Sequence, residues 1–331
     1  MKTQKRKLDH LETCLNNDVE SGRPNGFERY ELMHNALPEM NADEADCSTR
    51  FLGKDFSAPL SIEPMTGGTV EALRINRNLA KAAQALGIGM GLGSQRAMIE
   101  NPALAPTYQV RDVAPRIFLA GNIGAAQISE LGLERIRAAV QAVNVDALVI
   151  HLNAAQEIAQ DDGHKSWNGA LDAIRTLKAG LRMPVIAKEV GCGISGEVAQ
   201  RLQHAGVDAI DVAGAGGTSW VKVDSLITGK PMGNFFGWGI PTAQCLEQCM
   251  GKVRIPVIAS GGIRNGVEAA KAIAMGASLV GLALPLLKAA AKSEDAVSRC
   301  LGQVIMELKV AMFLVGARNL RELRGKAVKV C

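Results

Sequence analysis

The sequence predicts an α/β protein built as a closed (β/α)8 TIM barrel, with an N-terminal arm and a long loop after the sixth strand. Two observations carry this prediction: eight short apolar runs that end near glycines, and Ala/Leu-rich helical stretches between successive runs. Strands that alternate with helices form parallel sheets through right-handed crossovers. Eight such repeats within roughly 250 residues match a sheet that closes on itself.

The candidate strands are continuous apolar runs, which is the pattern expected where both faces of a strand are buried. In chain order they cover 58–65, 87–93, 116–122, 146–152, 184–190, 208–213, 256–260 and 278–284. The clearest stretches with apolar residues at helical spacing are 71–87, 134–143, 169–180, 195–206 and 266–277. An open doubly wound sheet is the alternative, but it needs a GxGxxG turn after the first strand, and the segment 65–70 does not supply one.

Two segments fall outside this alternation. Residues 1–55 hold polar clusters and no strand-helix period, so we expect an arm outside a barrel that spans 56–331. About 40 residues between Gly214 and Pro256 exceed an ordinary connection, and we expect a lid there, with a helix starting near Thr242. The apolar stripe of the last long helix would pack either on the barrel, which is commoner, or on another subunit: Val297, Leu301, Val304, Leu308, Met312 and Val315.

Composition excludes several classes of protein. The 331 residues are 47% hydrophobic and 21% charged, which excludes a disordered chain and a coiled coil. A net charge of +4 is too small for a duplex-binding surface, so we expect no nucleic-acid partner. No long apolar run could span a membrane, and Asp9 and Glu12 interrupt the start where a secretory signal would be apolar. Seven cysteines, an odd number without a CxxC pair, favour a reducing cytoplasm.

Glycines and polar residues gather at the carboxyl ends of the predicted strands, where TIM-barrel enzymes hold their active sites. Gly261 and Gly262 after strand seven, with Thr218 after strand six, predict a phosphate site made of exposed backbone N–H groups. Arg264 would add a forked donor. A need for tight turns would account for a single glycine pair, but it is a weaker explanation for glycine pairs in two neighbouring loops.

A second group of polar residues fits a planar cofactor lying across the barrel. Ser94, Asn122 and Lys188 follow strands two, three and five, and their side chains suit the oxygens and ring nitrogens of a flavin. Lys188 is the most informative, because a buried ammonium is costly unless an anion or an electron-rich ring offsets it. A salt bridge to Glu189 is disfavoured, because successive strand residues point to opposite faces.

The densest polar cluster comprises His151, Asn153, Gln156 and Glu157, at and just after strand four. One carboxylate beside amides suits Mg²⁺, which takes few protein ligands, and Glu157 is the candidate ligand. A solvated loop would explain Glu157 alone, but not the whole cluster. Zinc is disfavoured because no second His or Cys stands at ligand spacing. Three histidines look like loop or surface residues and are assigned no role: His34, His164 and His204.

The basic N-terminus has two interpretations. Lys5, Arg6 and Lys7 with His10 would ordinarily form a frayed tail. Alternatively, they form an arm that folds over the barrel and neutralises a diphosphate.

Eight motifs, taken together, resemble one family. They are RKLDH at 6–10, MTGG at 65–68, GSQR at 93–96, HLN…QE at 151–157, KEVG at 188–191, AGAGGTSW at 213–220, WGIPT at 238–242 and ASGGIRNG at 259–266. This set is similar to the type II isopentenyl-diphosphate isomerases over nearly the whole chain. GGIR is shared with other flavin barrels, whereas RKLDH followed by HLN-x-x-QE is specific.

The resemblance implies an FMN-dependent barrel enzyme that interconverts isopentenyl and dimethylallyl diphosphate. It implies a requirement for Mg²⁺ and for flavin reduced by NADPH, although the reaction is redox-neutral, and it implies a homo-oligomer (tetramer or octamer) in the cytoplasm. The implied substrate-binding residues are Arg6, Lys7, His10, Ser94, Arg96, Asn153 and Gln156, with Glu157 on the metal. The implied FMN-binding residues are Pro64, Met65, Thr66, Ser94, Asn122, Lys188, Thr218, Gly262, Arg264, Ala283 and Leu284.

For catalysis, we expect the reduced flavin to act as acid and base. His151 would tune the flavin or relay protons. Gln156 would orient the substrate, because a neutral amide is far too weak an acid to protonate an alkene. Compared with the family pattern, no proline follows Asn153, Ala213 stands where serine is common, and the segment 161–167 differs.

Three alternative functions fit the sequence less well. An FMN-dependent 2-hydroxy-acid oxidase or dehydrogenase is expected to use a histidine near the end of strand seven, but no histidine follows His204. A nucleotide dehydrogenase of the inosinate type needs a cysteine in the loop after strand six, and 214–220 contains none. A non-catalytic sensor of phosphate ligands would not need metal ligands and a cofactor lysine together.

Overall fold

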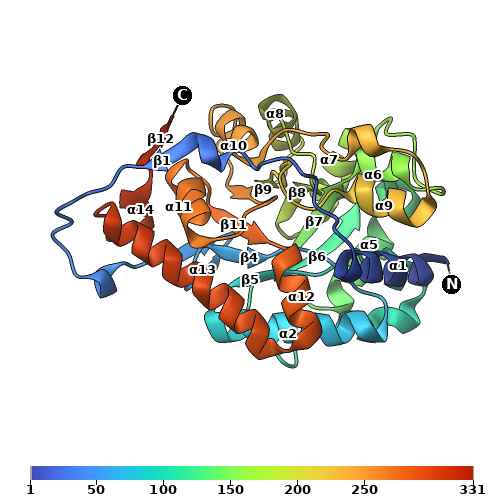
Figure 1. Ribbon diagram of the computed structural model, residues 1–331. Coiled ribbons are helices and arrows are strands. Elements are labelled where there is room, and N and C mark those ends of the chain that lie inside the picture. Colours follow the sequence, from blue (N-terminus) through green and yellow to red (C-terminus); the bar gives the residue numbers. More distant parts are fainter. Residues whose placement is uncertain (1, 331) are drawn as a thin grey trace.

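The computed structural model describes residues 2–330 and contains the expected closed barrel of eight parallel strands (Figure 1). In chain order the barrel strands are β4 (Leu60–Ile62), β5 (Gly89–Gly91), β6 (Leu119–Gly124), β7 (Ala147–Leu152), β8 (Val185–Glu189), β9 (Ala209–Asp211), β10 (Val257–Ala259) and β11 (Leu279–Leu282). Each overlaps one predicted strand, and β11 pairs with β4 to close the ring. The alternative of an open sheet is therefore wrong.

Strand register places three titratable residues in one layer. His151 on β7 is level with Lys188 on β8, and Lys188 is level with Asp211 on β9. Residues that are level on adjacent parallel strands point to the same face of the sheet. These three side chains therefore stand together at the carboxyl ends of the strands, which we call the mouth of the barrel.

Helices surround the barrel where the apolar periodicity predicted them. The five predicted stretches correspond to α2 (Val70–Leu86), α5 (Leu133–Ala142), α7 (Ala170–Gly180), α8 (Gly196–His204) and α11 (Gly266–Ala274). The long helix α13 (Glu294–Leu314) packs against α11, α2 and α12 (Leu284–Lys292). Its apolar stripe is buried there, so the stripe packs on the barrel of its own chain.

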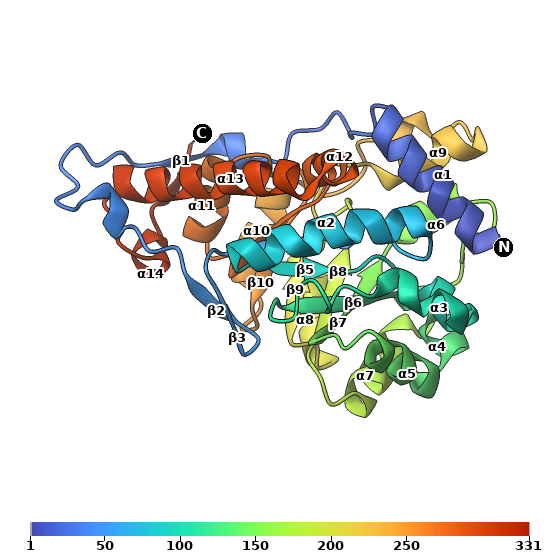
Figure 2. The same ribbon diagram turned by 90° about the horizontal axis from the view of Figure 1, so that it is seen from below.

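The N-terminal residues touch both ends of the barrel (Figure 2). Helix α1 (Lys2–Asn16) lies at the mouth, against α9 (Trp220–Thr228) and α12, with Leu11 and Cys14 buried. The interpretation of this segment as a frayed tail is therefore wrong. At the other end, the hairpin of β2 (Thr49–Phe51) and β3 (Lys54–Phe56) buries Phe51 and Phe56 against Phe118 and barrel residues. Strand β1 (Tyr30–Leu32) pairs with β12 (Ala327–Lys329).

The long segment after β9 folds into two helices. Helix α9 packs against α1 and α6 (Ala154–Ala159) at the mouth, in the region where we expected a lid. Helix α10 (Thr242–Met250) begins at the predicted residue and packs against α8 and β10. Within residues 2–330, no helix is long and apolar enough to cross a membrane. The six cysteines in that range are unpaired, and Cys331 lies outside it.

Candidate active site

One cavity opens at the mouth of the barrel. Its free volume is about 1620 Å³ with the open entrance included, and its walls come from α1 and from the carboxyl ends of the barrel strands. Every residue that the sequence assigned to a site lines it: Arg6, Lys7, His10, Pro64, Met65, Thr66, Ser94, Arg96, Asn122, His151, Asn153, Gln156, Glu157, Lys188, Thr218, Gly262, Arg264, Ala283 and Leu284. The fold therefore brings together residues that lie up to 278 positions apart in the chain.

Lys188 forms the charged base of the cavity. Its Nζ lies 2.6 Å from Glu63 Oε2 and 2.7 Å from Asp211 Oδ2, so two carboxyl groups offset its burial. It makes no pair with Glu189, as the strand geometry predicted. Burial alone would lower the pKa of Lys188, but Asp211 and Glu63 hold it above the ordinary value.

His151 is neutral at physiological pH. Burial, together with the nearby charges of Lys188 and Lys7, lowers its pKa to about 4. Its Nδ1 lies 2.8 Å from Asn122 Oδ1, an acceptor, so Nδ1 carries the proton and Nε2 carries the lone pair. The amide of Asn122 therefore fixes both the tautomer and the ring orientation.

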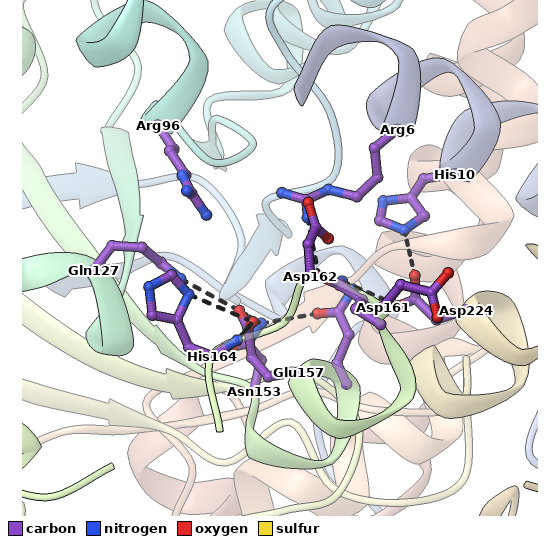
Figure 3. A network of polar contacts seen from close by, with 12 residues as sticks. Arg6, His10, Arg96, Gln127, Asn153, Glu157, Asp161, Asp162, His164 and Asp224 are labelled. Carbon is purple, nitrogen blue, oxygen red and sulfur yellow. Dashed lines mark hydrogen bonds and ion pairs between the residues drawn. The ribbon is translucent and has the colours of Figure 1, made fainter. Parts of the chain in front are cut away.

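Helix α1 supplies three basic side chains to the entrance of the cavity. Figure 3 shows Arg6 facing Asp162 and His10 facing Asp224 across the mouth, at 2.9 Å and 2.7 Å. Lys7 Nζ donates to the carbonyl of Ser94 at 2.5 Å and to the hydroxyl of Tyr108 at 2.7 Å. Burial and Arg6 lower the pKa of Lys7 to about 7.

Glu157 is held in a network of amide donors on α6 and its neighbours (Figure 3). Its Oε1 accepts from Asn153 Nδ2 at 3.0 Å and from Gln127 Nε2 at 3.3 Å, and its Oε2 accepts from the backbone N–H of His164 at 2.7 Å. Asn153 Oδ1 is buried without a hydrogen-bond partner. A buried carboxylate beside an unpaired amide oxygen fits Mg²⁺, which binds oxygen ligands and completes its shell with water and substrate.

The donor set around Glu157 does not suit a metal that needs several strong protein ligands. Among residues 2–330, no group of three or more His, Cys, Asp or Glu side chains lies at metal-binding spacing. Glu157 is the carboxylate that would hold an oxygen-liganded ion here.

Two glycine-rich loops meet on the opposite wall of the cavity. Gly262 has a φ of 77°, and a Cβ at that position would lie 2.2 Å from the carbonyl oxygen of Gly216. The loops after β9 and β10 therefore touch backbone to backbone, and their N–H groups can approach a phosphate closely. Arg264 stands beside them and pairs with Glu20 at 2.7 Å. A large cavity with this cradle at one wall and Lys188 at its base fits FMN.

The remaining predicted residues also have partners. Arg96 pairs with Glu100 at 2.6 Å, and the wall segment of Pro64, Met65 and Thr66 lies next to β5. A Cβ at Gly93 would lie 2.4 Å from the carbonyl of Thr66, so a glycine there allows the two strand ends to approach.

Several residues that line the cavity, or that contact its lining side chains, were not predicted. Glu63 and Asp211 hold Lys188, and Ser260 Oγ donates to Asp211 Oδ1 at 2.6 Å. A single acidic residue inside an apolar strand was the available signal for Asp211 in DAIDVA. Asp224, Gln160 and Gln127 were also missed, because their loops and helices give no periodic signal.

The divergent segment 161–167 contacts the same network. Asp162 binds Arg6, and Asp161 binds Lys230 at 3.0 Å. His164, to which the sequence assigned no role, donates its backbone N–H to Glu157, and its ring lies 3.4 Å from Glu130. The segment therefore ties α1 to the wall that carries Glu157.

The comparisons with known proteins identify the family of the chain. The sequence matches the FMN-dependent dehydrogenase family over residues 2–160 and 150–330. The isopentenyl-diphosphate delta-isomerase of Pyrococcus furiosus is 46% identical over 98% of this chain and 86% of its own length. That of Synechocystis sp. is 49% identical over 97% of this chain and 94% of its own length.

Among solved structures, (S)-mandelate dehydrogenase covers 99% of this chain and 98% of its own, with a TM-score of 0.70 and 18% identity. At that identity the likeness shows the fold alone, and the assignment rests on the family match and the close relatives. The chain belongs to the FMN-dependent dehydrogenase family and, within it, to the isopentenyl-diphosphate delta-isomerases.

Proposed function

We propose that this protein interconverts isopentenyl diphosphate and dimethylallyl diphosphate by a 1,3-proton transfer that uses reduced FMN and Mg²⁺. The observation that carries the proposal is that Lys188, Glu157 and the basic residues of α1 line one cavity. A flavin, a divalent cation and a diphosphate can therefore meet over the same opening. The names of the close relatives support this substrate class.

The diphosphate would bind beneath α1. Arg6, Lys7 and His10 line the entrance from α1, Ser94 lines it from the loop after β5, and Arg96 lines it from the start of α3 (Arg96–Glu100). Charged donors make the strongest hydrogen bonds to phosphate oxygens. Arg6, His10 and Arg96 pair with carboxylates in this structure, and a diphosphate would replace those carboxylates. Glu157 would hold Mg²⁺ against the same phosphates.

FMN would lie across the barrel with its polar edge toward Lys188, Asn122 and Ser94. Its phosphate would reach the cradle formed by Thr218, Gly262, Arg264, Ala283 and Leu284, and its ring would lie beside Pro64, Met65 and Thr66. When bound and reduced, this cofactor supplies an electron-rich face and an exchangeable proton. NADPH is the reductant that the family resemblance implies.

The residues of the chain then have three tasks in the reaction. The reaction adds a proton to C4, the terminal alkene carbon, and removes a proton from C2, which lies next to the methylene that carries the diphosphate. The positive charge that develops between these two steps must be shielded from water. Leu11, Met65 and Trp220 line the cavity and would exclude water from the alkene. His151 remains neutral and can accept a hydrogen bond through Nε2. Gln156, which is buried beside Asn153, would orient the substrate.

A 2-hydroxy-acid oxidase or dehydrogenase is less well supported. Enzymes of that kind share the fold, as the mandelate dehydrogenase comparison illustrates. Here the loop after β10 reads Gly261-Gly262-Ile263-Arg264, and no histidine follows His204 that could act as its base.

The family resemblance leads us to expect a tetramer or octamer. The cysteine content favours a cytoplasmic location, and the missing strand-helix period favours an arm comprising residues 1–55 beside a barrel domain from residue 56. These expectations stand apart from the assignment of the reaction.

The proposed function is tested by anaerobic incubation of isopentenyl diphosphate with the protein, FMN, Mg²⁺ and dithionite, followed by product analysis. We expect dimethylallyl diphosphate in the complete mixture and none when FMN, Mg²⁺ or dithionite is omitted. Equal product in the mixture without flavin would refute the role of FMN. Absence of product from protein saturated with all components would refute the reaction.

A further inference from the structure

Three buried charged residues meet at the base of the cavity. Lys188 on β8, Asp211 on β9 and Glu63 directly after β4 are 6%, 2% and 5% exposed. If all three were ionised, the cluster would carry a net charge of −1 away from water. An unbalanced buried charge is costly, and a protein commonly avoids it by taking up a proton.

Asp211 is the better-stabilised carboxylate of the two. Its Oδ2 pairs with Lys188 at 2.7 Å, and its Oδ1 accepts from Ser260 Oγ at 2.6 Å and from the backbone N–H of Ala213 at 3.3 Å. A carboxylate that accepts several hydrogen bonds favours its charged form. Asp211 therefore has hydrogen-bond donors on both of its oxygens, which Glu63 does not.

Glu63 has a different environment. Its Oε2 lies 2.6 Å from Lys188 Nζ, but this oxygen is buried and has no aligned hydrogen-bond partner among the described residues. A buried carboxylate oxygen that accepts no hydrogen bond is costly in its charged form, which favours a proton on Glu63. The other side of Glu63 faces Gly281, where a Cβ would lie 2.1 Å from Oε1, so β11 brings no charged group against it. Burial and the charge of Asp211 raise the pKa of Glu63 to about 8, although Lys188 opposes the shift.

Lys188 is held by three polar neighbours in this arrangement. Its Nζ donates to Asp211 Oδ2 at 2.7 Å and to the hydroxyl of Ser260 at 3.2 Å, and Glu63 Oε2 lies 2.6 Å away as its second ion-pair partner. A flavin edge can bind Lys188 only if one of these partners gives way. Glu63 is the partner with the fewest other hydrogen bonds, and it lines the cavity.

We propose that Glu63 holds a proton at neutral pH and is the positioning residue that yields Lys188 to the polar edge of the cofactor. A neutral Glu63 can leave Lys188 without stranding a negative charge beneath an electron-rich ring. When Glu63 loses its proton to solvent at high pH, its carboxylate keeps the ammonium and repels the ring. The part of this inference that concerns the flavin rests on the proposed function, whereas the protonation of Glu63 does not.

The protonation is tested on the FMN-free protein by infrared difference spectroscopy between about pH 6.5 and 9.5, where ordinary carboxyl groups do not titrate. We expect the carbonyl band of a protonated carboxylic acid in the wild type, its loss in Glu63→Gln, and its retention in Glu189→Gln. Glu189 is the matched control, because it is equally buried but accepts backbone N–H groups from 190–193. A band that is absent from the wild type, or that vanishes only in Glu189→Gln, would overturn the proposal.

The link to the cofactor is tested by titrating FMN into wild type and Glu63→Gln over the same pH range and following flavin fluorescence. At pH 7 the two proteins should bind FMN within about threefold of each other. Above pH 8 the wild-type dissociation constant should rise by up to about tenfold per pH unit relative to the variant. Parallel profiles, or tighter binding by the variant already at pH 7, would contradict the link. If neither protein binds FMN, the proposed function fails, and the infrared band still decides the state of Glu63.

Discussion

Gly262 offers a test of the phosphate cradle whose size can be worked out from the structure. In Gly262→Ala the new Cβ would lie 2.2 Å from the carbonyl oxygen and 2.4 Å from the carbonyl carbon of Gly216. Both are backbone atoms, so no side chain can rotate away, and the two loops must separate. The left-handed φ of 77° adds a conformational cost of about 1–2 kcal/mol for an L-residue. Displacing one charge-assisted hydrogen bond to the phosphate should remove about 1.5–3 kcal/mol of binding energy.

These values predict that Gly262→Ala raises the FMN dissociation constant by roughly ten- to a hundredfold. Gly169→Ala is the matched control, because Gly169 has the same φ of 77° but nothing within 4 Å of its Cβ position, and it precedes α7 outside the barrel. Both variants should lose about 1–2 kcal/mol of stability in a urea titration because of the left-handed φ, and Gly262→Ala should lose more, because its Cβ also forces the two loops apart. Only Gly262→Ala should lose FMN affinity, measured by flavin fluorescence. If folded Gly262→Ala binds FMN within about twofold of the wild type, the cradle is assigned to the wrong loops.

Three further substitutions test other parts of the account. Lys7 has a pKa lowered to about 7 by burial and Arg6, so its charge is lost as the pH rises through neutrality. The KM for isopentenyl diphosphate should therefore rise at least about fivefold between pH 6.5 and 8.5, and this rise should flatten in Lys7→Arg, whose guanidinium stays charged; matching profiles would contradict the assignment. Glu157→Gln should weaken Mg²⁺ binding in the presence of inorganic pyrophosphate about tenfold or more by calorimetry, whereas the exposed Glu130→Gln should not. Equal affinities in both variants would exclude Glu157 as the ligand. Phe51→Ala should destabilise the fold by about 3–5 kcal/mol in urea unfolding, because Phe51 is 2% exposed beneath the barrel, while the half-exposed Phe235→Ala should change it by less than about 0.5 kcal/mol. A small effect of Phe51→Ala would show that the β2–β3 hairpin contributes little to packing at the end of the barrel opposite the mouth.

The barrel was predictable because each strand is a short apolar run followed by a helical period. The site at its mouth followed from the same pattern, because polar residues such as Asn122 and Lys188 stand where an apolar run ends. Both signals are local in the chain, and parallel topology then brings the strand ends together.

The partners of Lys188 were not predictable in the same way. Glu63 lies 125 positions earlier and Asp211 lies 23 positions later, and only the closed register brings them within 3 Å of its ammonium. The hydrogen bond from His164 to Glu157 uses a backbone N–H, which any residue other than proline could supply, so the sequence carries no signal for it.

Local signals also failed in the first 55 residues. Helix α1 is polar on most of its surface, and its few buried residues, Leu11 and Cys14, pack in a helix whose partners α9 and α12 lie more than 200 positions later in the chain. The hairpin turn places Leu52 and Gly53 at positive φ, and leucine is an uncommon residue in that conformation. The hairpin was therefore missed, although aromatic residues flank the turn.

The proposed reaction is a proton transfer on isopentenyl diphosphate, bound in the cavity at the mouth of the barrel, without net oxidation. It is tested most directly by proton NMR of isopentenyl diphosphate in D₂O with the reduced, FMN-saturated and Mg²⁺-loaded protein. We expect dimethylallyl diphosphate that carries deuterium in its newly formed methyl group. Substrate that stays unlabelled and unconverted under these conditions, or that appears as an oxidised product, would contradict it.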